Sequence, residues 1–424
     1  MQTMPESPSI FRKISLFLLG LGPAFLAIGY TIGTGSVTSM VVAGNRFGMD
    51  LLWVLLLSCV FSWILMEAYG RYTLVTNETA LFAIRKHIKY GNLICILIIV
   101  GVTFGQWNSL IGILGISANA IFEVFSTFFP LLVEYQYVTI LVVGIIILTT
   151  MYIILLQGRY TNLEKVLIFF VSIMGISFLI SLFFVAPSPK QMAAGLIPSI
   201  PNVQGGTMLV AAFVGTTMAS ATFLSRSLFI KGKGWTISNL GDQSKDARLA
   251  AIMIFVISGS IMAITASALA GKDVSIIKVL DMVNTLEPLL GRFAVTIFLF
   301  GILGAGLSSV FPILLITPIL IADYQSGELD LKSRQFKIIT GLACVVGLTV
   351  PIFGANPINA QILSQVFNVF VLPLVILSIL ILTNRKNLMG KYKASTFLNI
   401  GMSLAFVFSC IISYTGIVAI IQSI

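Results

Sequence analysis

The chain has 424 residues, of which 58% are hydrophobic and only 9% are charged. Soluble domains carry about 25% charged residues because their surfaces face water. This composition excludes a soluble globular protein and predicts a chain whose surface lies mostly against lipid. The net charge of +10 does not indicate a nucleic-acid partner, because the basic residues lie in short loops and form no basic face on a polar domain.

Eleven apolar runs meet or approach the length of about 20 residues that a helix needs to cross a bilayer core of about 30 Å. Backbone groups in lipid must bond within their own segment, so we predict an all-α polytopic membrane protein. The first run is too long for a signal peptide and is expected to be a retained span. The runs cover residues 14–43, 51–70, 92–122, 138–157, 166–186, 206–230, 249–271, 293–322, 338–353, 359–383 and 396–422.

Lys and Arg are distributed unevenly between alternate loops. With the N-terminus placed in the cytoplasm, twenty of the 25 lie on the cytoplasmic side. The other five are Arg46, Lys190, Lys272, Lys278 and Arg292. Short cytoplasmic loops of membrane proteins are enriched in Lys and Arg. We therefore expect an integral protein of the cell (inner) membrane with a cytoplasmic N-terminus.

Small and hydroxyl residues interrupt the first and sixth spans at mid-depth. The two segments are Gly33-Thr34-Gly35-Ser36 and Gly215-Thr216-Thr217-Met218-Ala219-Ser220. Gly costs about 1 kcal/mol in a helix interior, so both clusters favour local unwinding. Two broken spans that are separated by five positions in the order of spans are typical of two inverted five-helix repeats with a binding site at the bilayer midplane. The alternative is that these residues only let helices pack closely.

We expect a single transmembrane domain over residues 1–424, with repeats at about 14–186 and 206–383 and an extra span at about 396–422. Nothing in the sequence predicts a cofactor or an enzyme. Cys59, Cys95, Cys344 and Cys410 all lie in apolar runs without the spacing of a metal site, and His87 stands alone in a basic loop. No nucleophile and base are brought together by any recognisable pattern.

Several segments together resemble the NRAMP family of divalent-metal transporters. They are residues 44–53 (GNRFGMDLLW) before and into the second span, residues 303–309 (LGAGLSS) in the eighth, and residues 363–390 from LSQV through Leu372-Pro373 to Leu388-Met389-Gly390 in and after the tenth. The resemblance covers residues 15 to 395 approximately. It implies a LeuT-like fold with an ion held between the unwound parts of the first and sixth spans.

The resemblance also implies which positions form the ion site. The family's Asp-Pro-Gly-Asn motif, whose Asp and Asn bind metal, matches residues 33–36, so both side-chain ligands are missing here. The family's Met-Pro-His motif matches residues 218–220, where only the thioether ligand remains. The implied substrate-binding residues are Gly33, Thr34, Gly35, Ser36, Gly215, Met218, Ala219, Ser220 and Gln365, with Met218 as the metal ligand.

The acidic residues limit what such a site can hold. The family's third-span acids match Gln106 and Ser109, which cannot ionise, and only Glu67 among the fifteen acids is expected within the apolar core of a span. Glu67 precedes Arg71 by four residues and is expected to pair with it. Dications are usually held by carboxylates and further oxygens. The missing carboxylate therefore disfavours a bare, tightly bound divalent ion.

Three functional hypotheses remain open. The first is a secondary transporter that moves a small cation, which the resemblance implies is a divalent metal ion, by alternating access. The second is a transporter of another small polar solute on the same scaffold, because the metal-binding carboxylate is missing. A non-transporting membrane sensor is the third, and no appended soluble domain supports it. The expected partners are the transported ion or solute and the lipid bilayer, while the oligomeric state is not predicted.

The predicted topology can be tested by cysteine labelling from outside the cell. Single cysteines at Asn239 and Asn356, in a chain lacking its four native cysteines, should differ. A membrane-impermeant reagent should label position 356 and spare position 239, because the basic residues place them on opposite sides. The reverse labelling pattern would contradict this topology.

Overall fold

The computed structural model describes residues 22–157, 160–184, 187–199, 206–269, 279–328, 330–353 and 357–423, and every regular element in these ranges is a helix. The α-helices are α2 (Gly22–Thr31), α3 (Thr34–Phe47), α4 (Leu52–Thr76), α5 (Ala80–His87), α6 (Gly91–Phe128), α7 (Gln136–Leu156), α8 (Tyr160–Phe184), α9 (Pro189–Ala194), α10 (Gly206–Thr217), α11 (Ser220–Gly232), α12 (Leu240–Leu269), α13 (Val279–Gln325), α14 (Arg334–Gly347), α15 (Thr349–Phe353), α16 (Pro357–Asn384), α17 (Lys386–Met389) and α18 (Thr396–Ser423). Short 3-10 helices are η1 (Pro130–Val133), η2 (Ile237–Asn239) and η3 (Gly390–Tyr392).

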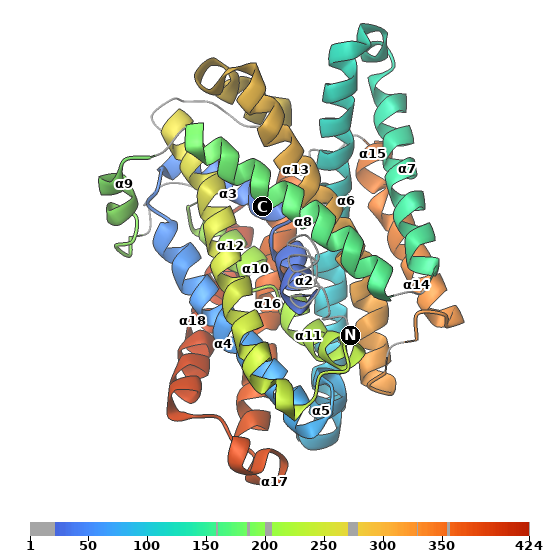
Figure 1. The fold of residues 1–424 in the computed structure, drawn as a ribbon, viewed down its shortest axis with the longest axis vertical. Helices are drawn as coiled ribbons and strands as arrows, with labels where there is room; N and C mark the ends of the chain where they lie inside the picture. Colours follow the sequence, from blue (N-terminus) through green and yellow to red (C-terminus); the bar gives the residue numbers. More distant parts are fainter. Residues whose placement is uncertain are drawn as a thin grey trace, which may run out of the picture.

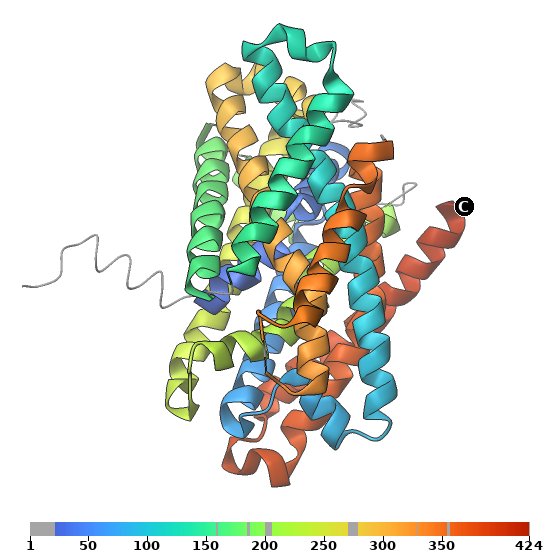
Figure 2. The ribbon, with the colours of Figure 1, turned by 90° about the vertical axis from the view of Figure 1, so that its right-hand side faces the viewer.

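The long helices form a bundle whose members run mostly along the long axis of the molecule (Figures 1 and 2). Among the described residues, ten helices are long and apolar enough to cross a membrane, or eleven if one bent pair counts as a span. The bent pair is α2 and α3, which meet at 52°. These helices correspond to the eleven predicted apolar runs, and the prediction of an all-α polytopic protein is confirmed.

The sequence did not predict three short helices, which connect the long ones. Figure 1 shows α5 and α17 at one end of the bundle and α9 toward the other. The repeat bounds stay a prediction. Of the two positions chosen for labelling, Asn239 ends η2 and is partly exposed, whereas Asn356 lies outside the described residues.

Helix α5 is fixed to the end of the bundle by acidic side chains. Asp323 on α13 accepts hydrogen bonds from the backbone N–H groups of Leu81 and Phe82, at 2.9 and 3.1 Å. His87 is not a free loop histidine, because its Nε2 lies 2.7 Å from Glu78. Burial by itself raises the pKa of the Glu78 carboxyl, but hydrogen bonds with Lys86 and His87 outweigh burial and lower it below its ordinary value.

Close packing of α10 against α16 depends on a glycine. A Cβ atom added at Gly215 would collide with the backbone carbonyl oxygen of Gln365, and it would lie 3.1 Å from Val369 Cγ2. The backbone of Gln365 cannot rotate away from the added Cβ atom, as the flexible end of a side chain could. Small residues at such contacts let membrane helices approach closely. Gly215 therefore brings the sixth and tenth spans together beside the break in the sixth.

We predict that Gly215→Ala lowers the stability of the purified protein by about 1–3 kcal/mol, because the added methyl overpacks a backbone contact. Gly259→Ala on α12 is the matched control, since its Cβ would meet Leu55 Cδ2 at an ordinary 3.8 Å. Thermal unfolding in detergent should show a lower midpoint for the first variant and no loss for the second. Equal midpoints would contradict the account of this contact.

Candidate functional site

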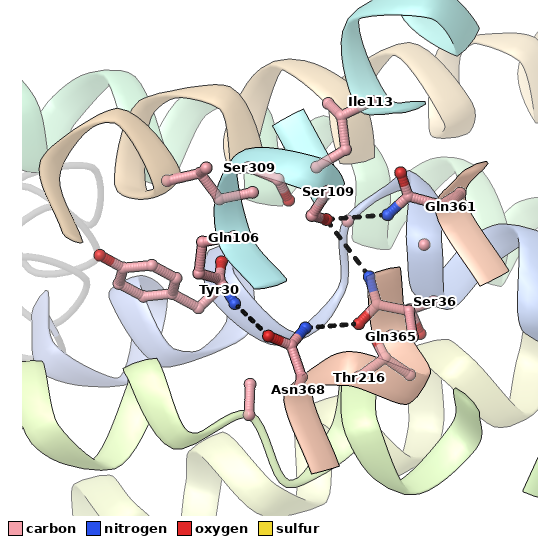
Figure 3. Close-up of a pocket in the computed structure, with 14 residues that line it drawn as sticks. Tyr30, Ser36, Gln106, Ser109, Ile113, Thr216, Ser309, Gln361, Gln365 and Asn368 are labelled. Atoms are coloured by element: carbon pink, nitrogen blue, oxygen red, sulfur yellow. Dashed lines mark hydrogen bonds between the residues drawn. The ribbon is translucent and has the colours of Figure 1, made fainter. Parts of the chain in front are cut away.

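A small polar pocket lies where the first and sixth spans are broken (Figure 3). It is formed by both broken spans together with α6, α13 and α16, so it draws on helices from across the bundle. Its lining residues are Tyr30, Gly33, Gly35, Ser36, Gln106, Ser109, Ile113, Thr216, Ala219, Ser309, Ile313, Gln361, Gln365 and Asn368. The pocket is the meeting point that an inverted-repeat fold predicts.

The first break is stabilised by hydroxyl groups from other helices. Gly33 lies between α2 and α3 with φ −96° and ψ −172°. Ending α2 frees the carbonyl oxygens of its last turn, which need new hydrogen bonds in the membrane. Ser309 Oγ donates to the carbonyl of Gly29 at 2.6 Å, and Thr216 Oγ1 donates to that of Thr31 at 3.0 Å. The broken span is thereby tied to α13 and α10.

The second break is also stabilised by a hydroxyl group from another helix. Helix α10 ends at Thr217 and α11 begins at Ser220, with Ala219 in an extended conformation between them. The carbonyl oxygen of Thr217 accepts a hydrogen bond of 2.8 Å from Ser62 Oγ on α4. A third helix thus supplies the partner that the interrupted helix lost. Both predicted interruptions of the sequence are real breaks in the structure.

Amide and hydroxyl side chains form a continuous hydrogen-bonded chain along one wall of the pocket (Figure 3). Gln106 Nε2 donates to Asn368 Oδ1 at 3.2 Å, and Asn368 Nδ2 donates to Gln365 Oε1 at 3.3 Å. Ser109 Oγ then accepts from Gln365 Nε2 at 3.3 Å and from Gln361 Nε2 at 2.9 Å. All five side chains are buried. Helices α6 and α16 are therefore joined by neutral polar groups at the site.

Glycines make room for these amides. A Cβ at Gly35 would collide with the side-chain nitrogens of Gln361 and Gln365, and one at Gly105 would collide with Asn368 Oδ1. Gly35, in the first turn of α3, therefore allows the backbone of this helix to lie directly against the amide wall. Gln361 Oε1 is buried and has no hydrogen-bond partner among the described groups. An unsatisfied buried acceptor costs about 1–3 kcal/mol, so this group can gain from a ligand.

The structure brings five of the nine predicted site residues into the pocket lining. These are Gly33, Gly35, Ser36, Ala219 and Gln365. Four others are buried beside the pocket without lining it: Thr34, Gly215, Met218 and Ser220.

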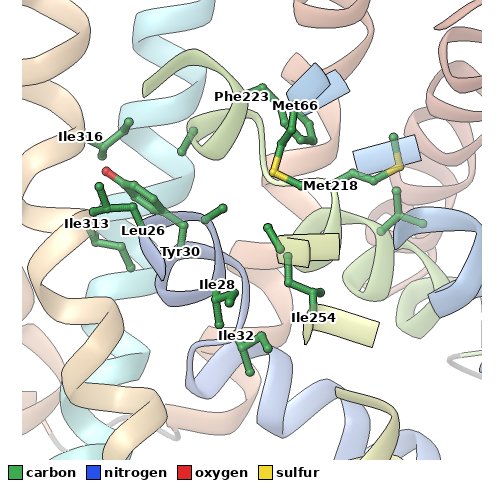
Figure 4. Close-up of a cluster of buried hydrophobic side chains, with 14 of the residues drawn as sticks. Leu26, Ile28, Tyr30, Ile32, Met66, Met218, Phe223, Ile254, Ile313 and Ile316 are labelled. Carbon is green, nitrogen blue, oxygen red and sulfur yellow. The ribbon is translucent and has the colours of Figure 1, made fainter. Parts of the chain in front are cut away.

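Met218, the predicted metal ligand, is fully buried in a cluster of hydrophobic side chains that includes Met66 and Phe223 (Figure 4). Its backbone N–H bonds the carbonyl of Val214 at 2.7 Å. In this conformation the thioether belongs to the apolar packing around the second break. Binding of an ion in the pocket by Met218 would require the side chain to turn out of this cluster.

Sequence reasoning did not place Gln361, Asn368 and Tyr30 at the site, whereas Thr216, part of the predicted break at residues 215–220, does line the pocket. One signal was present for the first two. Gln361, Gln365 and Asn368 are spaced by four and three residues, which puts them on one face of a helix. Polar amides on a single stripe of an otherwise apolar span indicate a lined cavity. Tyr30 carries no such periodic signal.

The polar groups that line the pocket are neutral. No described acidic side chain is among its lining residues, and the described part of the chain holds no group of three or more His, Cys, Asp or Glu that could bind a metal. Glu67 pairs with Arg71 at 2.7 Å, as predicted. The expectation that Glu67 is the only acid within a span is corrected, because α12 and α13 extend further than predicted and also bury Asp246 and Asp323.

Comparison with known proteins agrees with this architecture. A sequence model of the family described as "Nramp: Natural resistance-associated macrophage protein-like" matches residues 24–419. The chain belongs to the Nramp family. It is 26% identical over 403 residues to the divalent metal cation transporter MntH of Vibrio campbellii, covering 91% of this chain and 88% of the relative. The Klebsiella pneumoniae protein of the same name is 27% identical over 386 residues, covering 89% and 88%.

Solved structures show the same fold. The manganese transporter of Eremococcus coleocola, in complex with an aromatic bis-isothiourea compound, superposes with a TM-score of 0.76 at 17% identity, covering 98% of this chain and 88% of that one. MHP1, a nucleobase-cation-symport-1 family transporter, superposes with a TM-score of 0.57 at 15% identity, covering 94% and 90%. The predicted LeuT-like fold, with broken first and sixth spans, is confirmed.

Proposed function

We propose that this Nramp-family chain is a secondary transporter that moves a small cation, a divalent metal ion as its relatives' names state, by alternating access at the pocket between the two breaks. We further propose that the ion keeps part of its hydration shell while bound. The observation that carries this proposal is the neutral pocket wall of amides and hydroxyls. The protein is accordingly proposed to act as a carrier and not as an enzyme.

The neutral wall favours a hydrated ion on energetic grounds. Moving an isolated charge from water into a low-dielectric interior costs of the order of tens of kcal/mol, and no described lining residue offers a compensating negative charge. Water molecules that stay on a dication spread its charge and can donate hydrogen bonds to amide and hydroxyl oxygens. Gln361 Oε1, which lacks a partner, is one such acceptor.

The same neutral wall also favours a second candidate, a small polar solute. Amides and hydroxyls both donate and accept hydrogen bonds, so the chain from Gln106 to Gln361 suits an uncharged ligand that does the same. A solute of this kind needs no carboxylate partner. The two candidates differ in one respect, since only a metal ion gains strongly from a negative charge placed in the pocket.

The proposed arrangement in the membrane follows the basic residues. We propose insertion in the cell (inner) membrane with a cytoplasmic N-terminus, so that the end of the bundle carrying α5 and α17 faces the cytoplasm. The two repeats proposed from the sequence, at about residues 14–186 and 206–383, would move relative to each other around the pocket. Divalent metal transport then depends on opening the two sides alternately.

Restoring the family's missing ligands tests the proposed function. Gly33→Asp with Ser36→Asn should raise the affinity for Mn²⁺ at least about tenfold, because a carboxylate and an amide oxygen are added beside a partly dry site. The backbone angles of Gly33 suit Asp, but its Cβ would lie 2.5 Å from Ser309 Oγ. The variant should therefore also carry Ser309→Ala. Calorimetry and uptake into liposomes would be measured for wild type and variant.

Controls separate the two candidates. Ser309→Ala alone reports the cost of losing the hydrogen bond to Gly29, and adding Met218→Ala to the restored site asks whether the thioether turns into the pocket to bind a soft ion. Weak but measurable Mn²⁺ uptake by the wild type, strengthened in the restored variant, supports the metal proposal. Metal uptake by the restored variant only would favour the small polar solute. Tight Mn²⁺ binding by the wild type would contradict the argument from the neutral wall.

A further inference from the structure

A buried ion pair lies at the start of α2, outside the lining of the pocket. Arg226 on α11 and Asp246 on α12 are joined by a 2.6 Å contact between Nη2 and Oδ2, with side chains only 2% and 1% exposed. Gln243 Oε1 accepts further hydrogen bonds from the same guanidinium, at 3.0 Å from Nε and 2.5 Å from Nη2. Buried charges of this kind persist only when they are paired and fully hydrogen-bonded.

The ion pair reaches the first broken span through the backbone. The second carboxylate oxygen of Asp246, Oδ1, accepts a 3.1 Å hydrogen bond from the N–H of Ala24, in the first turn of α2. Pro23 immediately precedes Ala24, and Pro is typical of a helix start, where N–H groups have no partner within the helix. The negative charge also interacts favourably with this end of the helix dipole. One carboxylate thus joins α2, α11 and α12.

The pair is fixed from the opposite side by α4. Gln243 Nε2 donates to Glu67 Oε2 at 3.1 Å, and Glu67 pairs with Arg71. A Cβ at Gly70 would collide with the side chain of Gln243. The absence of a side chain on α4 at this position therefore leaves room for the Gln243 amide between the helices. With α4 holding Gln243 and Gln243 holding Arg226, the orientation of Asp246 toward Ala24 is set by three helices.

We propose that Ala24, Arg226 and Asp246 form a latch that holds the half-helix α2 closed over the pocket during the transport cycle. The latch divides into a strong part and a weaker one. Arg226 and Asp246 belong to helices that are close in sequence and stay together, whereas α2 is held to them by the hydrogen bond from Ala24. Movement of α2 away from α11 and α12 breaks that bond and leaves the carboxylate still paired, so opening exposes no unpaired buried charge.

The latch is a positioning device, and it acts on the pocket through α2. Residues Phe25 to Ile28 of this helix are buried, and its last turn carries Tyr30, which lines the pocket. Displacing the start of α2 therefore opens a route to the site from that membrane face, called here the α2 side. The inference rests on the proposed alternating access and is independent of which ion or solute is carried.

Accessibility of a single cysteine tests the latch without any substrate. Ala219→Cys, in a chain with the four native cysteines replaced by Ala, places a thiol in the pocket lining. Oriented vesicles would be exposed to a membrane-impermeant methanethiosulfonate from either side. Ala24→Pro replaces the latch N–H with a ring carbon that lies against Asp246 Oδ1, in the first turn of the helix where Pro is tolerated. It should speed labelling from the α2 side at least about tenfold, as the loss of a hydrogen bond to a charged group implies.

Matched variants make the result decisive. Ala24→Gly keeps the N–H and should label at nearly the wild-type rate, and Asp242→Asn changes an exposed acid one turn before Asp246 and should have no effect. Asp246→Asn should label faster than wild type from the α2 side because it leaves the buried guanidinium without a countercharge, and adding Arg226→Gln should slow labelling again because that unpaired charge is removed.

Two results would overturn the latch. One is unchanged labelling from the α2 side in both Ala24→Pro and Asp246→Asn. The other is equal acceleration from the two sides, which indicates general loosening of the fold. Because no metal or solute is present in the assay, these outcomes leave the proposed substrate untouched, and failure of Mn²⁺ transport would equally leave the latch standing.

Discussion

The fold depends on satisfying the backbone groups that are freed where two helices break inside the membrane. Carbonyl oxygens without partners cost several kcal/mol in hydrocarbon, so an unwound helix survives there only when neighbours supply donors. Ser309, Thr216 and Ser62 do this for the carbonyls of Gly29, Thr31 and Thr217. These hydroxyls come from α13, α10 and α4. The breaks, the bundle around them and the pocket between them are therefore one interdependent structure.

The pocket differs from the pattern that the family resemblance implies in the charge of its side chains and not in its place in the fold. On α6, Gln106 and Ser109 stand at the positions that the resemblance matches to the family's third-span acids, and these neutral side chains bond the amides of α16 across the helices. A wall of this kind is stable without an ion, because nearly all its polar groups already have partners. It can bind a ligand through the groups left over, and this favours loose capture of a hydrated ion or a polar solute over tight coordination.

Sequence reasoning was most successful where composition acts directly on the backbone. Gly33 and Gly35, and the small residues around Ala219, located both breaks because weak helix formers clustered inside an apolar run favour unwinding at that point. It was least successful for side-chain direction. Met218 stands at the second break, but only packing shows that its side chain is buried in the hydrophobic cluster that also includes Met66 and Phe223. Asn368 and Gln361 reach the pocket because α6 and α16 cross there, which no local pattern specifies.

The burial of charged side chains was also hard to predict, because it depends on where each helix begins and ends. Asp246 lay outside the predicted span, yet α12 begins at Leu240 and carries this carboxylate to the start of α2. Arg226 was counted among the cytoplasmic basic residues, whereas the structure buries it. A charged residue at the edge of an apolar run can therefore have two roles. Its sign contributes to the orientation of the chain in the membrane, and its ion-pair partner helps to hold the conformation of the helices around it.

In the proposed function, the pocket binds a metal ion through neutral groups and retained water. Pulsed electron–nuclear double resonance on purified wild-type protein, at Mn²⁺ concentrations that saturate the site, measures this directly through exchange of bound water into D₂O. We predict strong couplings to exchangeable protons of several waters on the bound ion. A bound Mn²⁺ without such couplings would contradict this proposal, because the protein would then have replaced the whole hydration shell without a carboxylate, and so would the absence of any saturable binding.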